Sequence, residues 1–558
     1  MARSWFWNLT GLQHLYLAET QLYGQASDAL AHMTSLQVLD LSSINMVMMT
    51  TSFRNLCNMR ILDLSACQIV GNIKDIVGRM PQCPLKKLQE LHLGYNNISG
   101  IMPNRTAHLS SLVVLDISGN NLSGGIPRGV GLLSSLSSLD LSSNYLSGPV
   151  PSEIAWFQFQ EDIRWMDISS TGIVDKLPDW FITTFAKATH LDISNNKISG
   201  SLPRNMEFMS LSEFYISSNK LTGEIPNLPR DITVLDMSEN SLSGNLPSNI
   251  GTPNLISLVL LSNQITGHIP QSLCKAEGLY ALDLNNNLFE GQLPHCLGVK
   301  NIISFLMLSN NRFSGNFPSF LKNCRQLTSL DLSHNSFSGR LPLWIRDLVE
   351  LRFLRLSQNM FFGEITATIS NLSRLHHLNL AGNGLSGAIP WHLSNVTAMT
   401  RKYVKDYKVD SNYGDYSTVI RTYNFSSVVI KGHQLDYGIG IWDLVSIDLS
   451  FNQLTGRIPE EIAALDGLIN LNLSWNQLSG KIPNKLGALH ALESLDLSRN
   501  MLSGGIPPSL SDLNYLSYMD LSDNNLTGRI TSGRQLDTLY TEEPSMYSGN
   551  SGLCGPPL

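Results

Sequence analysis

The side chains most able to do chemistry in this chain are histidines and aspartates, and their spacing does not form a catalytic arrangement. The histidines are scattered: His376 and His377 are adjacent, and His433 is far from both in the sequence. Aspartate recurs in the tetrapeptide Leu-Asp-Leu-Ser, as at Asp448 and Asp496, because the surrounding sequence recurs. A serine hydrolase needs a serine, a histidine and an acid that meet in space, and no such combination is recognisable. The glycines follow the same recurring frame rather than a phosphate-binding loop, so we expect neither an enzyme nor a cofactor.

The chain of 558 residues is built from one repeated frame. Residues 492–507 read LESLDLSRNMLSGGIP, and similar segments lie 24 residues earlier around Asn476 and 24 later around Asn524. A fixed period of this length is the signature of a solenoid. Alternate leucines such as Leu495 and Leu497 point to one side of a short strand and stack on the leucines of the next coil. No single coil can bury its own leucines, so stability is shared between neighbouring coils.

Each frame contains one asparagine where the chain turns out of the strand. Its side-chain amide can bond the backbone of its own and the adjacent coil, which satisfies groups that would otherwise be buried without partners. This position predicts about 20 coils, and four of them carry Thr20, Ile44, Cys67 or Thr171 instead. A thiol is also a weak donor, whereas we expect looser coils at the threonines and the isoleucine.

One segment breaks the period. Asn383 and Asn452 are 69 residues apart, which is one coil plus about 45 residues, roughly residues 399–443. A loop of this length in a compact array is either functional or disordered. The segment has almost no leucine and is rich in tyrosine, lysine and arginine, and tyrosine and arginine make rigid amphipathic contact surfaces. We therefore interpret it as a Tyr/Lys-rich island that binds a ligand; the alternative is a tolerated insertion without a role. The predicted ligand-binding residues are Tyr403, Tyr407, Tyr413, Tyr416, Tyr423, Lys431 and Tyr437 of the island and His334 and Gln358 of the preceding coils.

The residue just before the frame's asparagine forms a variable row. The row reads His334, Gln358 and Gly382 before the island and Phe451, Trp475, Arg499 and Asp523 after it. A phenylalanine and a tryptophan on neighbouring coils beside an arginine resemble a binding hot spot. The alternative is that they are ordinary exposed surface residues.

Four of the seven cysteines fall into two pairs, each separated by about one coil. We predict a disulfide between Cys57 and Cys83 and another between Cys274 and Cys296, which suits an oxidising compartment. The alternative is that one or both pairs are reduced. No CxxC spacing and no cluster of cysteine and histidine indicates a metal site.

Sequons for N-glycosylation are numerous, although many arise by chance in a repeat rich in asparagine and serine. The candidates are Asn8, Asn97, Asn104, Asn121, Asn371, Asn395, Asn424 and Asn525.

The frame LxxLxxLDLSxNxLSGxIP, the island followed by four coils, and the tail YSGNSGLCGPPL together closely resemble the ectodomain of plant leucine-rich-repeat receptor-like proteins. The resemblance covers essentially the whole chain. It implies an α/β-type solenoid, a right-handed plant-type leucine-rich-repeat superhelix with a parallel β-sheet on the concave face and 3-10 or irregular segments on the convex side. The expected organisation is residues 1–398 as about 16 coils, 399–443 as the island, 444–532 as four coils and 533–558 as a partial C-terminal cap. The family's signal peptide, N-terminal cap and membrane helix are not recognisable, so we expect a piece of a receptor.

The resemblance implies a cell-surface recognition protein at the extracellular face of the plasma membrane, acting in defence or development. The island would help to bind an extracellular peptide or protein. Phe451, Trp475, Arg499 and Asp523 on the last four coils would face a co-receptor kinase that has a short leucine-rich-repeat ectodomain. A net charge of −7 leaves no basic face for nucleic acid. The alternative function is a secreted leucine-rich-repeat inhibitor of a microbial cell-wall-degrading enzyme, a class that resembles shorter arrays without an island.

Overall fold

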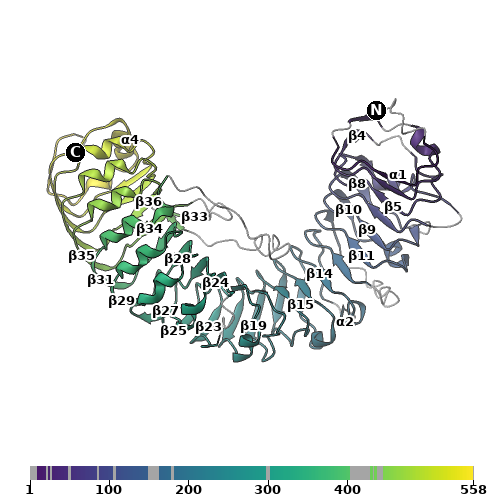
Figure 1. Cartoon of the computed structure of the whole chain (residues 1–558), viewed down its shortest axis with the longest axis horizontal. Coiled ribbons are helices and arrows are strands. Elements are labelled where there is room, and N and C mark those ends of the chain that lie inside the picture. The colour runs from purple at the N-terminus through teal and green to yellow at the C-terminus, as the bar shows by residue number, and fades with distance from the viewer. Residues whose placement is uncertain are drawn as a thin grey trace. The chain divides into compact units, whose positions relative to one another are not determined.

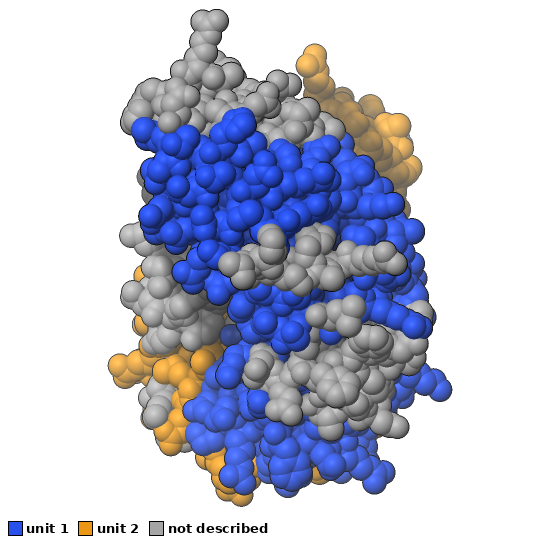
Figure 2. All heavy atoms as spheres, turned by 90° about the vertical axis from the view of Figure 1, so that its right-hand side faces the viewer, with its two compact units in different colours: residues 1–255, 259–265 blue, residues 256–258, 266–558 orange. Residues whose placement is uncertain are grey.

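The computed structural model describes residues 9–20, 23–25, 28–47, 52–83, 87–104, 109–148, 163–177, 181–296, 302–401, 428–430, 433–435 and 444–556. The chain divides into two compact units, which Figure 2 colours separately. Unit 1 contains residues 1–255 and 259–265, and unit 2 contains residues 256–258 and 266–558.

The main sheet of unit 1 is parallel and contains one strand of three residues from each coil (Figure 1). Each strand pairs in register with the next one along the chain. The strands are β1 (His14–Tyr16), β3 (Val38–Asp40), β5 (Ile61–Asp63), β7 (Glu90–His92), β9 (Val114–Asp116), β11 (Ser138–Asp140), β13 (Trp165–Asp167), β14 (His190–Asp192), β16 (Glu213–Tyr215) and β18 (Val234–Asp236).

The main sheet of unit 2 follows the same rule. Its strands are β22 (Ala281–Asp283), β24 (Phe305–Met307), β26 (Ser329–Asp331), β28 (Phe353–Arg355), β30 (His377–Asn379), β34 (Ser446–Asp448), β36 (Asn470–Asn472), β38 (Ser494–Asp496) and β40 (Tyr518–Asp520). Strand β30 pairs directly with β34, although residues 399–443 separate them in the sequence. The coils before and after the predicted island are therefore neighbours in the stack. Within the island, the structure describes a short antiparallel pair, β32 (Val428–Ile430) and β33 (His433–Leu435).

A second strand follows the asparagine in most coils and forms smaller parallel sheets. In unit 1 these strands are β2 (Tyr23–Gln25), β4 (Asn45–Val47), β6 (Val70–Asn72), β8 (Asn97–Ile101), β10 (Asn121–Gly124), β12 (Tyr145–Leu146), β15 (Ser199–Ser201), β17 (Lys220–Gly223) and β19 (Ser241–Asn245). In unit 2 they are β23 (Leu288–Gly291), β25 (Arg312–Asn316), β27 (Ser336–Gly339), β29 (Met360–Glu364), β31 (Gly384–Ala388), β35 (Gln453–Gly456), β37 (Gln477–Gly480), β39 (Met501–Gly504), β41 (Asn525–Arg529) and β42 (Gly552–Cys554). This second row of strands was not predicted from the sequence.

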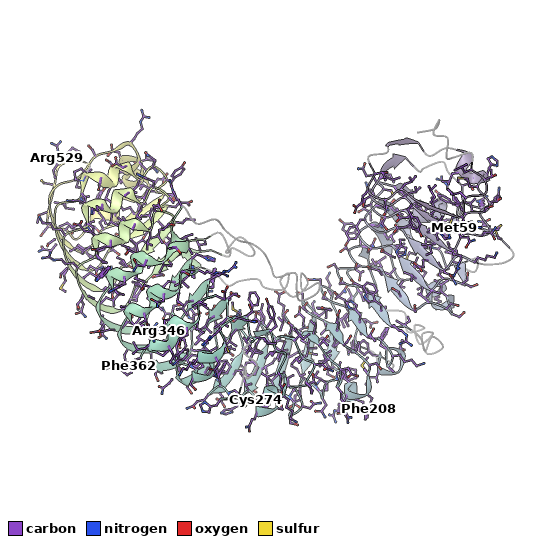
Figure 3. The ribbon with its side chains drawn as sticks, viewed as in Figure 1. Met59, Phe208, Cys274, Arg346, Phe362 and Arg529 are labelled. Atoms are coloured by element: carbon purple, nitrogen blue, oxygen red, sulfur yellow. A yellow bond between two sulfur atoms is a disulfide. The ribbon has the colours of Figure 1, made fainter. Side chains whose placement is uncertain are left out.

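Short 3-10 turns complete many coils, as predicted for the side opposite the main sheet. Examples are η9 (Leu343–Asp347), η10 (Ala367–Asn371), η11 (Trp391–Asn395), η15 (Glu460–Ala464), η16 (Asn484–Ala488) and η17 (Pro508–Asp512). The α-helices α1 (Ile73–Val77) and α2 (Phe181–Thr184) stand between consecutive main-sheet strands, where other coils have a 3-10 turn, and α4 (Arg534–Glu542) follows β41. Phe208 (73 % exposed) and Phe362 (49 %), labelled in Figure 3, come from a 3-10 turn and a second strand and project outwards.

The leucine core and the asparagine ladder form as the frame predicts. Leu495 and Leu497 are fully buried. The side-chain amide of Asn476 donates to the carbonyls of Leu449 (3.0 Å), Leu473 (3.2 Å) and Ser474 (3.1 Å). Its Oδ1 accepts the backbone N–H of Leu454 at 3.0 Å. One side chain thus satisfies four backbone groups and links two coils.

In the coils that lack the ladder asparagine, the residue at that position makes fewer hydrogen bonds to the backbone. The thiol of Cys67 donates to the carbonyl of Leu41 at 2.9 Å. The hydroxyl of Thr171 donates to the carbonyl of Ile168 (2.8 Å) and approaches Oδ1 of Asn196 at 3.0 Å. Both side chains are buried, so each occupies the space of the missing asparagine. Because they make fewer hydrogen bonds, they join the neighbouring coils less strongly.

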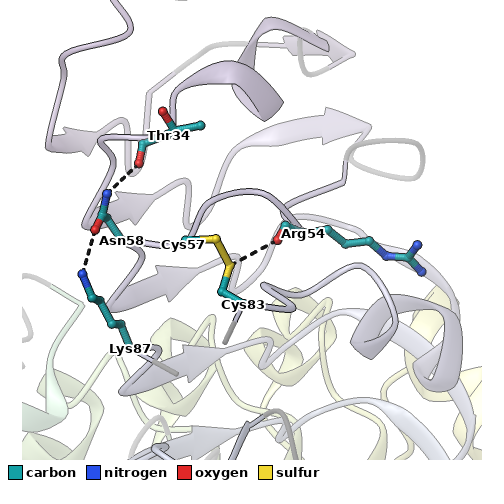
Figure 4. Close-up of a disulfide and its surroundings, with 6 residues drawn as sticks. All are labelled: Thr34, Arg54, Cys57, Asn58, Cys83 and Lys87. Carbon is teal, nitrogen blue, oxygen red and sulfur yellow. Dashed lines mark hydrogen bonds between the residues drawn. A yellow bond between two sulfur atoms is a disulfide. The ribbon is translucent and has the colours of Figure 1, made fainter. Parts of the chain in front are cut away.

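Both predicted disulfides are formed. Cys57 is bonded to Cys83 and Cys274 to Cys296, with Cα–Cα distances of 5.6 and 5.5 Å. Beside the first disulfide, Asn58 donates to the carbonyl of Thr34 (3.0 Å) and accepts from Nζ of Lys87 at 2.8 Å (Figure 4). The disulfide and this polar chain tie neighbouring coils together near the start of unit 1.

Candidate functional site

The variable row of unit 2 has a special backbone conformation. Phe451, Trp475, Arg499 and Asp523 all have φ between 51° and 53°, a left-handed conformation that is uncommon for residues with a side chain. A hydrogen bond to the next coil holds each of them: the N–H of Trp475, for example, donates to the carbonyl of Ser498 at 3.0 Å. The chain turns at this residue, and its side chain is left at the surface beside the main sheet.

The side chains of this row stack on one another along four successive coils. The rings of Phe451 and Trp475 lie 5.0 Å apart with an angle of 17° between their planes. The guanidinium of Arg499 lies 4.2 Å from the centre of the Trp475 ring, and its Nη2 is 3.3 Å from Oδ2 of Asp523. Phe451 is 49 % exposed and Trp475 is 45 % exposed. We call these four residues the aromatic strip; it offers flat apolar faces ordered by a cation–π contact.

His334 and Gln358 lie on the same row, two coils and one coil before Gly382, and both are exposed. Phe451 follows Gly382 directly because β30 pairs with β34. The structure therefore brings the two predicted ligand-binding residues of the coils into line with the aromatic strip. The island residues Tyr403, Tyr407, Tyr413, Tyr416, Tyr423, Lys431 and Tyr437 lie outside the described residues.

The same sheet contains a buried ion pair that was not predicted from the sequence. Nη1 of Arg355 lies 3.1 Å from Oδ2 of Asp331, and the two side chains are 7 % and 1 % exposed. They occupy the same frame position on adjacent strands. The sequence does contain a sign of this pair. Arg355 stands at a frame position that is usually aspartate, and the preceding coil keeps its aspartate, Asp331.

The recurring aspartates act as backbone anchors. Oδ1 of Asp448 accepts the N–H of Ser450 at 3.0 Å and its hydroxyl at 2.7 Å. Asn472 makes the same two bonds to Ser474 on the next coil, at 3.1 and 2.7 Å. Burial, with a smaller contribution from Asp496, raises the pKa of Asp448 from 3.8 to about 6.

Replacing Asp448 by asparagine is expected to raise the local unfolding free energy above pH 6. Because its folded-state pKa is raised, the folded chain binds more protons than the unfolded chain between pH 3.8 and about 6, and stability falls as the pH rises through that range. Asp448→Asn removes this loss of stability because the amide does not ionise. Asn472, at the same position of the next coil, shows that an amide can make the same two hydrogen bonds. We expect a gain of about 2 kcal/mol at neutral pH and little change near pH 4, measured by hydrogen exchange of β34 and β36 amides. An equal effect at both pH values would contradict the assignment.

The sequon asparagines that the structure describes are all exposed. Asn97 and Asn121 lie on β8 and β10, where their side chains hydrogen-bond each other. The others are Asn104, Asn371 at the end of η10, Asn395 at the end of η11, and Asn525 on β41. Asn8 and Asn424 lie outside the described residues. Glycosylation at these positions stays a prediction.

Within the described part of the chain, no group of three or more histidine, cysteine, aspartate or glutamate side chains is placed to hold a metal ion. Over the same residues, we find no helix with the length and apolar character that crossing a membrane requires.

Family models for the leucine rich repeat match many coils of both units. One matches residues 86–146 and 304–361, and another matches residues 187–209, 231–252, 374–396, 443–465, 467–489 and 491–513. Among curated proteins, the tomato (Solanum lycopersicum) receptor-like protein EIX2 is 36 % identical over 83 residues. That match spans 14 % of this chain but only 8 % of EIX2.

Solved plant receptor ectodomains align along nearly the whole chain. The Arabidopsis receptor kinase HAESA, solved in complex with the peptide hormone IDA and the co-receptor SERK1, is 30 % identical with a TM-score of 0.76; the alignment covers 98 % of this chain and 87 % of HAESA. The plant peptide hormone receptor RGFR1, solved with RGF2, is 30 % identical with a TM-score of 0.72, covering 96 % and 80 %. The coil geometry and these matches agree, and the chain belongs to the plant leucine-rich-repeat receptor ectodomains.

Proposed function

We propose that this chain is the recognition ectodomain of a cell-surface protein that binds an extracellular peptide or protein and associates with a co-receptor kinase. The ectodomain fold belongs to a non-catalytic family, so signalling in defence or development would pass through the partner kinase. Two disulfides between coils suit the oxidising extracellular side of the plasma membrane.

The aromatic strip is the observation that carries this proposal. Phe451 and Trp475 keep about half of their surface exposed while stacked on each other, and tryptophan, tyrosine and arginine are the residues that dominate interface energies. A rigid stack loses little conformational freedom on binding. We propose that the short leucine-rich-repeat ectodomain of the co-receptor covers this strip.

The ligand would lie on the same row, closer to the island. His334 and Gln358 are exposed on the coils that precede it, and we propose that they contact the ligand together with the island tyrosines and Lys431. A ligand placed there would lie next to the aromatic strip, so that one bound peptide could contact the receptor and the co-receptor together.

The proposal is tested by titrating the secreted chain with the purified SERK1 ectodomain, in the presence and absence of apoplastic peptide extract. We expect saturable binding that the extract strengthens. In parallel, the chain is added to a microbial cell-wall-degrading enzyme, whose activity should not change. Inhibition of the enzyme without co-receptor binding would support the secreted-inhibitor alternative and contradict the proposal.

A further inference from the structure

The outward face of the main sheet in unit 1 has a strongly one-sided charge. The first and third residues of the described strands β1 to β18 point away from the leucine core, and these positions hold nine carboxylates and neither lysine nor arginine. Asp116, Asp140, Asp167 and Asp192 stand in register on four consecutive strands, about 4.8 Å from one strand to the next. Such close carboxylates repel one another and attract a cation.

The aspartates of this row are only partly used by the fold. Oδ1 of Asp140 accepts the N–H and hydroxyl of Ser142 at 2.9 and 2.7 Å. Oδ1 of Asp167 and Oδ1 of Asp192 each accept a serine N–H at 2.8 Å. These four bonds all end on Oδ1. A bound molecule could therefore donate to Oδ2 while these turn bonds to Oδ1 stay in place.

Aromatic side chains lie beside these carboxylates and give the face a defined shape. Trp165 stacks on His190 with ring centres 4.9 Å apart and planes within 10°. His190 also meets the ring of Tyr215 at 5.6 Å, and its Nδ1 lies 2.7 Å from Oε2 of Glu213. Glu213 is thus already paired with His190, and the half-buried Trp165 lies on β13, the strand that also carries Asp167.

We infer that this surface, which we call the acidic face and define as Asp140, Trp165, Asp167, His190, Asp192 and Tyr215, docks an extended peptide segment that carries arginine or lysine. The inference rests on the proposed function, because it names the chemical class of part of the ligand. A guanidinium can donate two parallel hydrogen bonds to a carboxylate while its plane lies against an aromatic ring. Charge complementarity over several strands would select basic segments and steer them to the sheet.

The test uses the full chain and a fluorescent octapeptide of alternating glycine and arginine, with a glycine–glutamate octapeptide of the same length as comparison. Fluorescence anisotropy at physiological ionic strength should show binding of the arginine peptide alone. The double variant Asp167→Asn with Asp192→Asn should weaken binding by about tenfold or more. Asparagine occupies the same frame position at Asn379 and Asn472 and keeps the bond to the following turn, so the double variant should fold, as circular dichroism will check.

The matched control is Asp496→Asn, which changes the same strand position in unit 2 and should leave the affinity for the arginine peptide unchanged. Equal weakening by this control would mean that diffuse negative charge attracts the peptide, and would overturn the inference, as would equal binding of the glutamate peptide. Binding of the same variants to the SERK1 ectodomain is measured in parallel. If the double variant loses arginine-peptide binding but still binds SERK1, the acidic face binds the peptide independently of the co-receptor. If neither the original chain nor any variant binds SERK1, the result counts against the proposed function itself.

Discussion

Replacing Trp475 by alanine is expected to weaken binding of the co-receptor ectodomain by about 30-fold, which corresponds to a loss of about 2 kcal/mol. The indole ring stacks on Phe451 on one side and carries the guanidinium of Arg499 on the other. Its removal takes away contact surface and also releases both neighbours from their fixed positions. The Arg499–Asp523 pair is about half exposed on each side, so it contributes little without the ring. Surface plasmon resonance with the immobilised chain measures the affinity.

The matched control for this variant is Tyr95→Ala. Tyr95 occupies the same position before the ladder asparagine, has φ of 54° and is 72 % exposed, but it lies in unit 1. Its replacement should leave the affinity for the co-receptor unchanged. A second variant, Trp475→Gly, removes the ring while suiting the left-handed backbone, as Gly382 does on the same row. If the two variants at Trp475 bind as tightly as the original chain, the strip is not part of the interface.

Replacing Asn476 by alanine is expected to lower the local unfolding free energy by about 3 kcal/mol. Its amide donates to three carbonyls and its Oδ1 accepts one N–H from the preceding coil. Asn476 is only 9 % exposed, so water cannot easily replace these bonds. In a solenoid the loss acts through the two coils that the side chain joins. Hydrogen exchange of amides in β34, β36 and β38 should accelerate by about two orders of magnitude, and distant coils should keep their protection.

Gln477→Ala provides the comparison for that variant. Gln477 is the next residue, is exposed, and begins strand β37. Its replacement should change the unfolding free energy by less than about 0.5 kcal/mol. Equal exchange rates in the Asn476→Ala and Gln477→Ala variants would contradict the ladder's role in joining coils.

Much of the fold follows from local rules that the sequence displays. The alternation of Leu495 and Leu497 predicts an inward-facing strand, and the structure buries both completely. The 24-residue spacing of Asn476, Asn500 and Asn524 predicts stacked coils, and the hydrogen bonds of each asparagine to the preceding coil follow from it. The two disulfides were predictable because each pair is separated by one coil length, which places the cysteines side by side.

Other features depend on contacts between coils, which a single frame does not reveal. The left-handed backbone of Phe451 and Trp475 arises because each N–H bonds the following coil, although their residue types do not favour that conformation. The Arg355–Asp331 pair and the Trp165–His190 stack need two side chains at equal positions of adjacent coils. Such pairs become visible only when the sequence is aligned coil by coil. Whether the variable row binds partners does not follow from periodicity, because a recurring frame specifies the core and leaves the surface free.

The most direct test of the proposed recognition surface places the photo-crosslinking residue benzoylphenylalanine at position 475 and, in a separate protein, at position 95. Both positions share the same left-handed backbone and high exposure. Each protein is illuminated with the SERK1 ectodomain, and the products are identified by mass spectrometry. We predict a crosslink to SERK1 from position 475 and none from position 95. A SERK1 crosslink from position 95 alone, or from neither position while the two proteins are shown to bind, would contradict the assignment of the aromatic strip as the co-receptor surface.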